Sequence, residues 1–230
     1  MPNPALSMPR QDALAVMLDD ASAYLMVDSF NGAPANMRPY RFFNPFLCWP
    51  EPAIPVPGQP GRLARSVESI WQGLKLVDNR TDFDQLTSVP RKRPTDAERR
   101  VLAGYRYRDS CFAYGDRQLD LLDARFLIYL PSYLFVLDKL APEPLLQALR
   151  DHVDHVGPVL FYDWDANQDI TDTSASFSHS AILASWFNGS LEEQYFVAAR
   201  QCLSGADWRI FEARVDALLG RYRDLNRDQS

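Results

Sequence analysis

The segment from residue 31 to residue 65 limits what this chain can fold into more than any other. It holds about half of the chain's 17 prolines. Proline removes a backbone donor and blocks a helix interior, so no long helix can run through this segment. The segment also carries Phe42, Phe43, Phe46 and Trp49, too many aromatic side chains for a solvated linker. We therefore expect an ordered loop region, anchored by aromatic side chains over one face of the domain.

Helical periodicity dominates the rest of the chain. Apolar residues recur at helical spacing over 11–27, and a helix is also expected over 66–77. In the segment 90–104, Thr95 and Glu98 stand at the positions of a capping box. Further helices are expected in two or three pieces within 114–153, with Pro131 kinking or splitting the first and Pro142 and Pro144 separating the last, and then near 175–187, 190–203 and 206–226.

A strand is expected at "GPVLFYDW", residues 157–164, because a run of β-branched and aromatic residues follows a Gly-Pro break. The pattern as a whole predicts a mainly α, multihelical single domain over 1–230 with two or three short β-strands. Within it we expect an N-terminal helix extension at 1–30, the Pro/aromatic-rich loop region at 31–65, a core at 66–190 and C-terminal helices at 191–230.

Charge and cysteine content restrict the partners and the compartment. The formal net charge is −6, which does not suit binding to a nucleic acid backbone, although a local basic patch stays open. The three cysteines, Cys48, Cys111 and Cys202, are widely spaced and odd in number, which indicates a reducing compartment. The first 20 residues lack the pattern of a secretion signal, and no apolar run is long enough to cross a bilayer. We expect a cytoplasmic protein without a membrane partner.

The stretch "RSVESIWQGLK", residues 65–75, is the first candidate for chemistry. At about 100° per residue, Glu68, Gln72 and Lys75 gather beside an apolar stripe, with Trp71 between the two. A carboxylate, an amide and an ammonium would then meet at the edge of a buried face. The alternative is structural: with Ser66 as N-cap, Glu68 lies in the first turn, where a negative charge gains about 0.3–1 kcal/mol from the helix dipole.

The second candidate is the acidic stretch "FYDWDANQDITD", which directly follows the expected strand. Asp163, Asp165, Asp169 and Asp172 are clustered there, and mutual repulsion can raise the pKa of one carboxyl enough for proton transfer near neutral pH. Clustered acids also suit a metal-dependent hydrolase or phosphatase. A calcium loop is disfavoured, since Gln168 stands where such a loop needs glycine. The structural alternative is a solvated loop that caps a helix.

Two further groups have mainly structural interpretations. His152 and His155 are three residues apart, but a metal site would need ligands from elsewhere, so an exposed helix end is favoured. The basic run 91–93, with Arg99 and Arg100 after it, is either a solvated face or a rim that contacts phosphate.

Two parts of the chain together resemble the NADAR (YbiA-like) superfamily, compact and largely helical N-glycosidases that act on ribosylated compounds. "FFNPF", residues 42–46, resembles the F-x-N-F element of that family, and Ser66, Glu68, Gln72 and Lys75 match its S-x-E-h-x-x-Q-x-x-K helix start. The family's later elements resemble "LLDARFLIYL", "EPLLQAL" and "VLFYDWDANQD", in the same order. Two features differ: a Trp-Gly that follows the family's second acid is missing, and the stretch before Ser66 is longer.

The resemblance implies cleavage of a C–N bond at the anomeric carbon of a ribose. The substrate would be a ribosylated pyrimidine phosphate or an ADP-ribosyl group, free or attached to a target, and no metal or cofactor is implied. Glu68 would be the motif glutamate, with Asp163, Asp165 or Asp169 as its partner acid or as an anchor for ribose hydroxyls. The remaining site residues would bind substrate: Phe43, Asn44, Phe46, Trp71, Gln72, Lys75 and Arg125.

Two other functions stay open at this point. One is a binder of ADP-ribose or nucleotides that keeps the pocket without the chemistry, as the missing Trp-Gly would allow. The other is the metallo-hydrolase or phosphatase centred on Asp163 and Asp165. Convergence of Glu68, Asn44 and one acidic-loop aspartate on a common cleft is the geometry that a glycosidase requires.

Overall fold

The computed structural model describes residues 4–20, 22–29, 35–102, 104–165 and 167–227 of the chain. Over these residues, ten α-helices make up most of the regular structure, and eight β-strands of two to five residues form three small sheets. The expected mainly α fold class is confirmed, with more strands than the two or three expected. Among the helices of these described segments, none is both long enough and apolar enough to cross a membrane.

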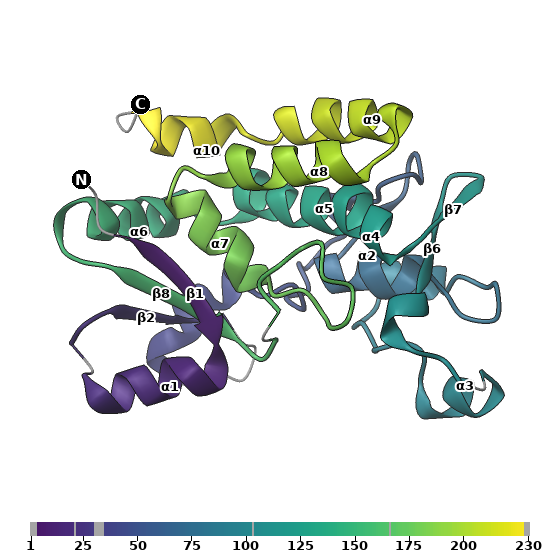
Figure 1. Ribbon diagram of the computed structural model, residues 1–230, viewed down its shortest axis with the longest axis horizontal. Helices are drawn as coiled ribbons and strands as arrows, with labels where there is room; N and C mark the ends of the chain where they lie inside the picture. Colours follow the sequence, from purple (N-terminus) through teal and green to yellow (C-terminus); the bar gives the residue numbers. More distant parts are fainter. Residues whose placement is uncertain (1–3, 21, 30–34, 103, 166, 228–230) are drawn as a thin grey trace.

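A three-stranded parallel sheet forms one end of the molecule (Figure 1). Its central strand is β8 (Val159–Asp163), with β1 (Ala5–Pro9) and β2 (Leu25–Asp28) on either side. Because side chains alternate along a strand, Phe161 of β8 joins the main core, whereas Leu160 and Tyr162 pack under α1 (Arg10–Asp19) on the other face. The strand expected at 157–164 is therefore present, and it is buried on both faces as the centre of a parallel sheet requires.

The helix expected over 11–27 is shorter than its apolar pattern indicates. It ends at Asp19, and Leu25–Asp28 form β2 instead of a last helical turn. A short apolar run such as Leu25-Met26-Val27 fits either a helix or a buried strand, and parallel pairing with β8 decides between them. Residues 5–28 thus contribute two strands and a helix to the sheet layer, which corrects the expected N-terminal helix extension.

A rod of continuous helical turns runs through the middle of the molecule from Leu121 to Leu140. It consists of α4 (Leu121–Ala124), the π-helical η4 (Arg125–Tyr129), α5 (Leu130–Phe135) and the π-helical η5 (Val136–Leu140). Pro131 lies inside the rod without splitting it. Its ring would clash with the preceding turn of a regular helix, and the wider turn just before it, where Leu130 N–H bonds to the carbonyl of Arg125, gives the ring room.

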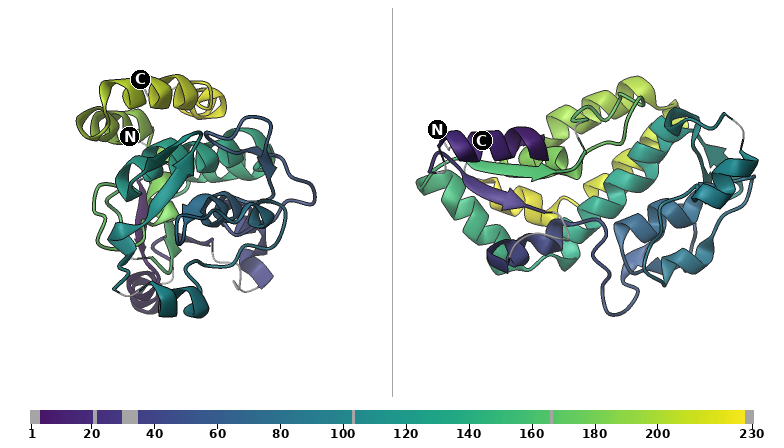
Figure 2. Two further views of the ribbon diagram at one scale, coloured as in Figure 1. Left: turned by 90° about the vertical axis from the view of Figure 1, so that its right-hand side faces the viewer. Right: turned by 90° about the horizontal axis from the view of Figure 1, so that it is seen from below.

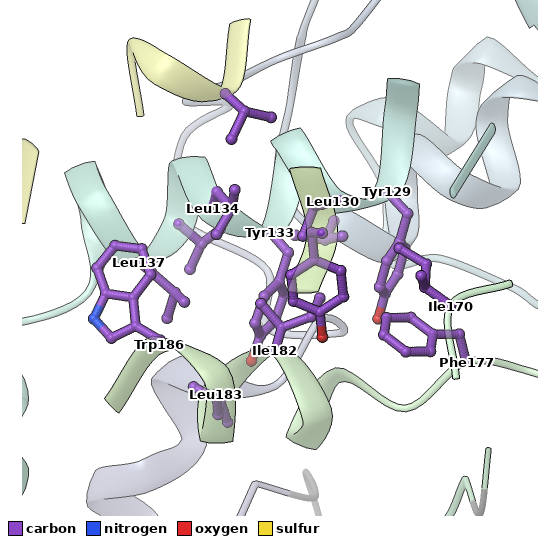
Figure 3. Close-up of a cluster of buried hydrophobic side chains, with 14 of the residues drawn as sticks. Tyr129, Leu130, Tyr133, Leu134, Leu137, Ile170, Phe177, Ile182, Leu183 and Trp186 are labelled. Carbon is purple, nitrogen blue, oxygen red and sulfur yellow. The ribbon is translucent and has the colours of Figure 1, made fainter. Parts of the chain in front are cut away.

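The rod packs against α7 (His179–Phe187) to form the centre of the core (Figure 3). Tyr133 of the rod is fully buried, and so is Trp186 of α7. Each fully buried apolar side chain contributes about 1.5–3 kcal/mol to folding. The other apolar side chains that meet between these two elements in Figure 3 are Leu130, Leu134, Leu137, Ile182 and Leu183.

The C-terminal helices run along one side of the rod, above it in Figure 1, and the last of them lies toward the sheet end (Figures 1 and 2). They are η6 (Glu192–Phe196), α8 (Val197–Cys202), α9 (Gly205–Asp216) and α10 (Gly220–Leu225), and α6 (Glu143–His155) precedes them in the chain. The single helix expected over 206–226 is therefore two helices. The carboxylate of Asp138 accepts the backbone N–H of Arg221 at 2.7 Å, which fixes the start of the second.

The described part of the 31–65 region is ordered, as its aromatic content indicates. It holds the 3₁₀ helix η1 (Ala35–Phe43) and a hairpin of β3 (Ile54–Pro55) and β4 (Leu63–Ala64), while 31–34 lie outside the described residues. Phe42 stacks on Trp49 with 5.9 Å between ring centroids. Gly58, at φ +74°, sits so close to Tyr114 that a Cβ there would lie 2.7 Å from the tyrosine ring, so only glycine fits this approach.

α2 (Val67–Leu74) follows this region and leads into the third sheet. That sheet consists of β5 (Lys75–Leu76), β6 (Cys111–Tyr114) and β7 (Arg117–Leu119), with η2 (Phe83–Leu86), α3 (Asp96–Val101) and η3 (Tyr107–Asp109) in the connection between β5 and β6. The Ser66 hydroxyl caps α2 by accepting the N–H of Ser69, and Thr95 forms the expected capping box of α3 with Glu98. Both predicted caps are confirmed.

Candidate functional site

A cavity of about 760 Å³ opens where the carboxyl end of β8 meets α2, η4 and the first turn of α7. Carboxyl ends of parallel strands are a common position for binding sites, and this volume suits a small organic ligand. The lining brings together Asn44, Glu68, Asp163 and Asp165. The convergence expected from the sequence is therefore present.

Glu68 lies in the first turn of α2, and its side chain is buried in the cavity wall. The side-chain amide of Gln72 has a partner on each side. Its Nε2 donates to Glu68 Oε1 at 2.6 Å, and its Oε1 accepts the backbone N–H of Arg93 at 2.8 Å, which fixes the orientation of the amide. Burial raises the pKa of the Glu68 carboxyl, against the hydrogen bond from Gln72 and the charges of Lys75 and Lys92. Glu68 therefore lies both in the first turn of a helix and in the wall of the cavity.

Lys75 follows α2 as the first residue of β5, and its ammonium reaches the same cavity. Its Nζ donates to the backbone carbonyl of Arg93 at 3.0 Å. Burial lowers the pKa of this ammonium to about 8, while the nearby Glu68 carboxylate opposes the shift. Lys75 therefore tunes the electrostatics around Glu68, and it already has a backbone partner.

The acidic-loop aspartates separate into three environments. Asp163 is buried at the end of β8; burial alone would raise its pKa, but His179, Ser178 and the N–H of Asp165 bind the carboxylate and hold the pKa below its usual value. Asp165 lines the cavity half-buried, and burial together with the charge of Asp163 raises the pKa of its carboxyl. Asp169 is exposed, bonds Thr171 and is not part of the cavity lining, so its predicted catalytic role is not supported by its position.

Three of the predicted substrate-binding residues have partners within the protein, and two of them, Asn44 and Arg125, line the cavity. Phe43 is fully buried against Phe161 and does not line the cavity. The Asn44 side chain lies at the cavity wall, but its amide bonds the carbonyl of Ser29 and the N–H of Phe46. The two terminal nitrogens of the Arg125 guanidinium donate at 2.5–2.8 Å to the carbonyl oxygens of Ile170, Asp172 and Ala175.

Aromatic rings make up much of the remaining wall. Phe46 and Trp71 line the cavity as predicted. The Trp71 ring packs against Phe112 with 4.1 Å between centroids and meets Tyr129 edge to face. Rings fixed by such contacts present flat apolar faces to a ligand at little entropic cost. Other aromatic lining residues were not selected from the sequence: Tyr105, Tyr107, Tyr129, Trp164 and Phe177.

The basic run contributes cations to the cavity. Arg93 is buried and paired with Glu98, whereas Lys92 and Arg99 are exposed residues of the lining. Within the described part of the chain, the Lys92 ammonium has no hydrogen bond or ion pair and lies 5.9 Å from the Phe46 ring centroid. Five Lys and Arg side chains line the cavity against three carboxyl groups, in a chain whose net charge is −6. The local excess of positive charge favours an anionic ligand.

His179 is the functional candidate that sequence reasoning missed. Its imidazole lines the cavity at the first turn of α7 and contacts Asp163, with 2.6 Å between Nδ1 and Oδ2. His152 and His155, the histidines singled out from the sequence, lie in the last turn of α6 instead. Across the described residues, no three His, Cys, Asp or Glu side chains are grouped closely enough to hold a metal ion. The sequence did contain a signal for this contact: a helix that includes His179 is expected near 175–187, soon after the strand that ends at the acidic Asp163.

The fold and the cavity define a mainly helical protein with a polar, aromatic and cationic cavity at the edge of a small parallel sheet. The chain belongs to a family of unknown function, DUF6939, whose family model matches residues 21–183. The matched segment includes every residue of the cavity lining from Asn44 to His179. No curated protein and no solved structure matches the chain.

Proposed function

We propose that this protein is an N-glycosidase-type hydrolase that cleaves the C–N bond between a ribose, a ribose phosphate or an ADP-ribose and a nitrogen base or adduct. The observation that carries the proposal is the buried Glu68, whose pKa is raised and whose cavity also contains Asp165. The resemblance of residues 42–75 to the NADAR superfamily supports the same reaction. A carboxyl with a raised pKa is a stronger base than an ordinary carboxylate near neutral pH.

In the proposed reaction, water attacks the anomeric carbon while the C–N bond breaks. Glu68 orients this water and accepts its proton, and its carboxylate stabilises the oxocarbenium-like centre that develops on the sugar. Asp165 gives a proton to the departing nitrogen, a role supported by the raised pKa of its carboxyl. The products are the free sugar, with the new hydroxyl at the anomeric carbon, and the protonated base.

The other lining residues suit a substrate with one flat and one anionic end. Trp71 and Phe46 would stack on the base, and Lys92 with Arg99 would hold a phosphate at the rim. Lys75 would tune Glu68. We also propose a cytoplasmic location, supported by three cysteines without disulfide spacing.

A non-catalytic binder of ADP-ribose or nucleotides is the second candidate. The observation that favours it is the cavity wall itself, because fixed aromatic rings and rim cations bind such ligands without any chemistry. Calorimetry and product detection separate the two candidates. Saturable binding across a panel of nucleotides and ADP-ribose compounds, with no released base by mass spectrometry, would favour the binder.

The test of the glycosidase is Glu68→Gln, which keeps the volume and a partner for Gln72 but removes the base. Turnover, measured as released base by liquid chromatography and mass spectrometry, is expected to fall by about 10²- to 10⁴-fold. Ligand affinity and the melting temperature serve to show that the cavity is intact. Asp169→Asn is the matched control, because Asp169 is an acid of the same loop outside the cavity and should retain near-wild-type turnover. Unchanged turnover in Glu68→Gln would refute the proposal.

A further inference from the structure

A continuous series of contacts links the ends of two strands and the start of a helix beside the cavity. Ser29 follows β2, Asp163 is the last residue of β8, and His179 is the first residue of α7. His179 Nδ1 lies 2.6 Å from Asp163 Oδ2, and Nε2 is hydrogen-bonded to the Ser29 hydroxyl. Both ring nitrogens therefore have partners in the protein, and the ring orientation is fixed.

Asp163 connects His179 to Asp165, a residue of the cavity lining. Its Oδ2 also accepts the Ser178 hydroxyl at 2.9 Å, and its Oδ1 accepts the backbone N–H of Asp165 at 2.6 Å. The carboxylate also lies at the N-terminus of α7, where the helix dipole favours negative charge. Asp165 is thus attached directly to a carboxylate whose orientation depends on His179.

Ser, His and Asp in this order resemble a nucleophilic triad, but the position of the serine does not suit attack on a ligand. Ser29 is fully buried and is not part of the cavity lining. Its carbonyl accepts the Asn44 amide at 2.6 Å, and its hydroxyl is also near the carbonyl of Tyr162 at 3.5 Å. A nucleophile must reach the reacting atom, whereas the Ser29 hydroxyl lies in the protein interior, outside the cavity.

We infer that His179 and Asp163 form a positioning chain that holds Asp165 in the cavity as the partner acid of Glu68. Ser29 is the partner of the other ring nitrogen of His179 and lies outside this chain. The inference rests on the proposed function for the role of Asp165, and on the contacts above for the chain itself. His179 and Asp163 are then positioning residues: neither needs to touch the substrate. Outer partners of this kind commonly change activity by about 10- to 100-fold when they are removed.

Two substitutions at His179 separate its two contacts. His179→Asn places an amide N–H near the position of Nδ1, so it retains a donor for Asp163 and loses the contact to Ser29. His179→Gln extends to the position of Nε2, so it retains a partner for Ser29 and loses the donor for Asp163. We expect kcat to fall by about 10- to 100-fold in His179→Gln with little change in KM, and to be largely restored in His179→Asn. Equal kcat values in the two variants would overturn the inference.

A spectroscopic measurement on the whole protein does not depend on turnover. In the wild type, the His179 Nδ1 proton should resonate far downfield and the Asp165 amide should exchange slowly with solvent. Both signals should be lost in His179→Gln, whereas Ser29→Ala should retain the slow Asp165 amide. An Asp165 amide that stays protected in His179→Gln would overturn the chain even if Glu68 proves catalytic. Protection that follows the expected pattern without any turnover would support the chain and refute the glycosidase.

A fluorophosphonate probe tests the nucleophilic alternative directly. The inference predicts no labelling of Ser29 in the wild-type protein, as detected by peptide mass spectrometry. Labelling of Ser29 that disappears in His179→Gln would show an activated nucleophile and overturn the positioning role. Melting temperatures of all variants show which of them remain folded.

Discussion

The burial of Lys75 beside Glu68 couples the charge of the cavity to the stability of the protein. The pKa of the Lys75 ammonium is lowered from 10.5 to about 8, mainly by burial. Between these two values the unfolded chain binds more protons at this site than the folded chain. The free energy of unfolding contributed by Lys75 must therefore rise as the pH increases from about 8 to 10.5, by up to about 1.4 kcal/mol per pH unit.

This prediction is tested with Lys75→Met, which retains the apolar stem and removes the titration. Denaturant unfolding at several pH values between about 8 and 10.5 should show wild-type stability rising relative to the variant. Parallel pH profiles for the wild type and Lys75→Met would contradict the buried, coupled position of this ammonium.

At single residues, the sequence predicted which side chains come together better than it predicted which of them already have partners within the protein. Spacing on a helix was sufficient to bring Glu68 and Gln72 together, because residues four apart share a face. Nothing in the sequence distinguishes Asp165, which faces the cavity, from Asp169, which bonds its own loop. Arg125 lines the cavity, but three of its hydrogen bonds go to backbone carbonyls 45 to 50 residues away, which no local pattern can show.

α2 is the element on which the candidate site depends most. All eight of its residues are buried, and it carries Glu68, Trp71 and Gln72 to the cavity. The Ser66 hydroxyl both accepts the N–H of Ser69 and contacts the Ser69 hydroxyl at 2.7 Å, so the first turn depends on one side chain. Loss of this cap is expected to lower the free energy of global unfolding, since a fully buried helix cannot fray locally into water.

Ser66→Ala is therefore expected to lower the free energy of unfolding by about 1 kcal/mol, with an upper range near 2 kcal/mol. Thr95→Ala removes the equivalent cap from α3, where most of the described side chains are half-buried or exposed, and should have a smaller global effect. Urea unfolding of both variants measures the difference. A larger loss in Thr95→Ala than in Ser66→Ala would contradict the central position of α2.

Elements with strong local signals were predicted well, and those set by distant partners were not. The caps of α2 and α3 and the strand β8 follow from residues within a few positions of one another. β2 was predicted as helix because its identity depends on pairing with β8, more than 130 positions along the chain. Pro131 was expected to kink or split its helix; the helix is not split, because a π turn accommodates the proline, and such a turn leaves no signature in the apolar pattern.

The molecule as a whole is joined by one large apolar cluster that extends from Ala5 to Tyr222 and includes the sheet, the rod and the C-terminal helices. A smaller cluster lies under α1. Because the rod supplies the shared centre of the large cluster, we predict one cooperative unfolding transition, as the single-domain organisation expected over 1–230 requires. Tryptophan fluorescence and far-ultraviolet circular dichroism should give the same transition midpoint.

Leu134→Ala tests this prediction at the centre of the rod. Leu134 is fully buried, so its truncation should cost about 2–5 kcal/mol and shift both transitions together. Leu18→Ala is the matched control, because the Leu18 side chain is 85% exposed and should change stability by less than about 0.5 kcal/mol. Separate midpoints for the two signals, in either variant, would show that the chain folds as more than one unit.

The attachment of Arg125 to the loop over residues 170–175 also bears on how this family can diverge. The guanidinium holds the loop by main-chain oxygens, which every amino acid supplies, rather than by side chains. The exposed positions of that loop, such as Asp172 and Ser174, can therefore accept other residues while the path of the backbone stays the same. Such a loop permits new surface chemistry beside the cavity at little cost in stability, and a descendant protein could acquire a different specificity there without a new fold.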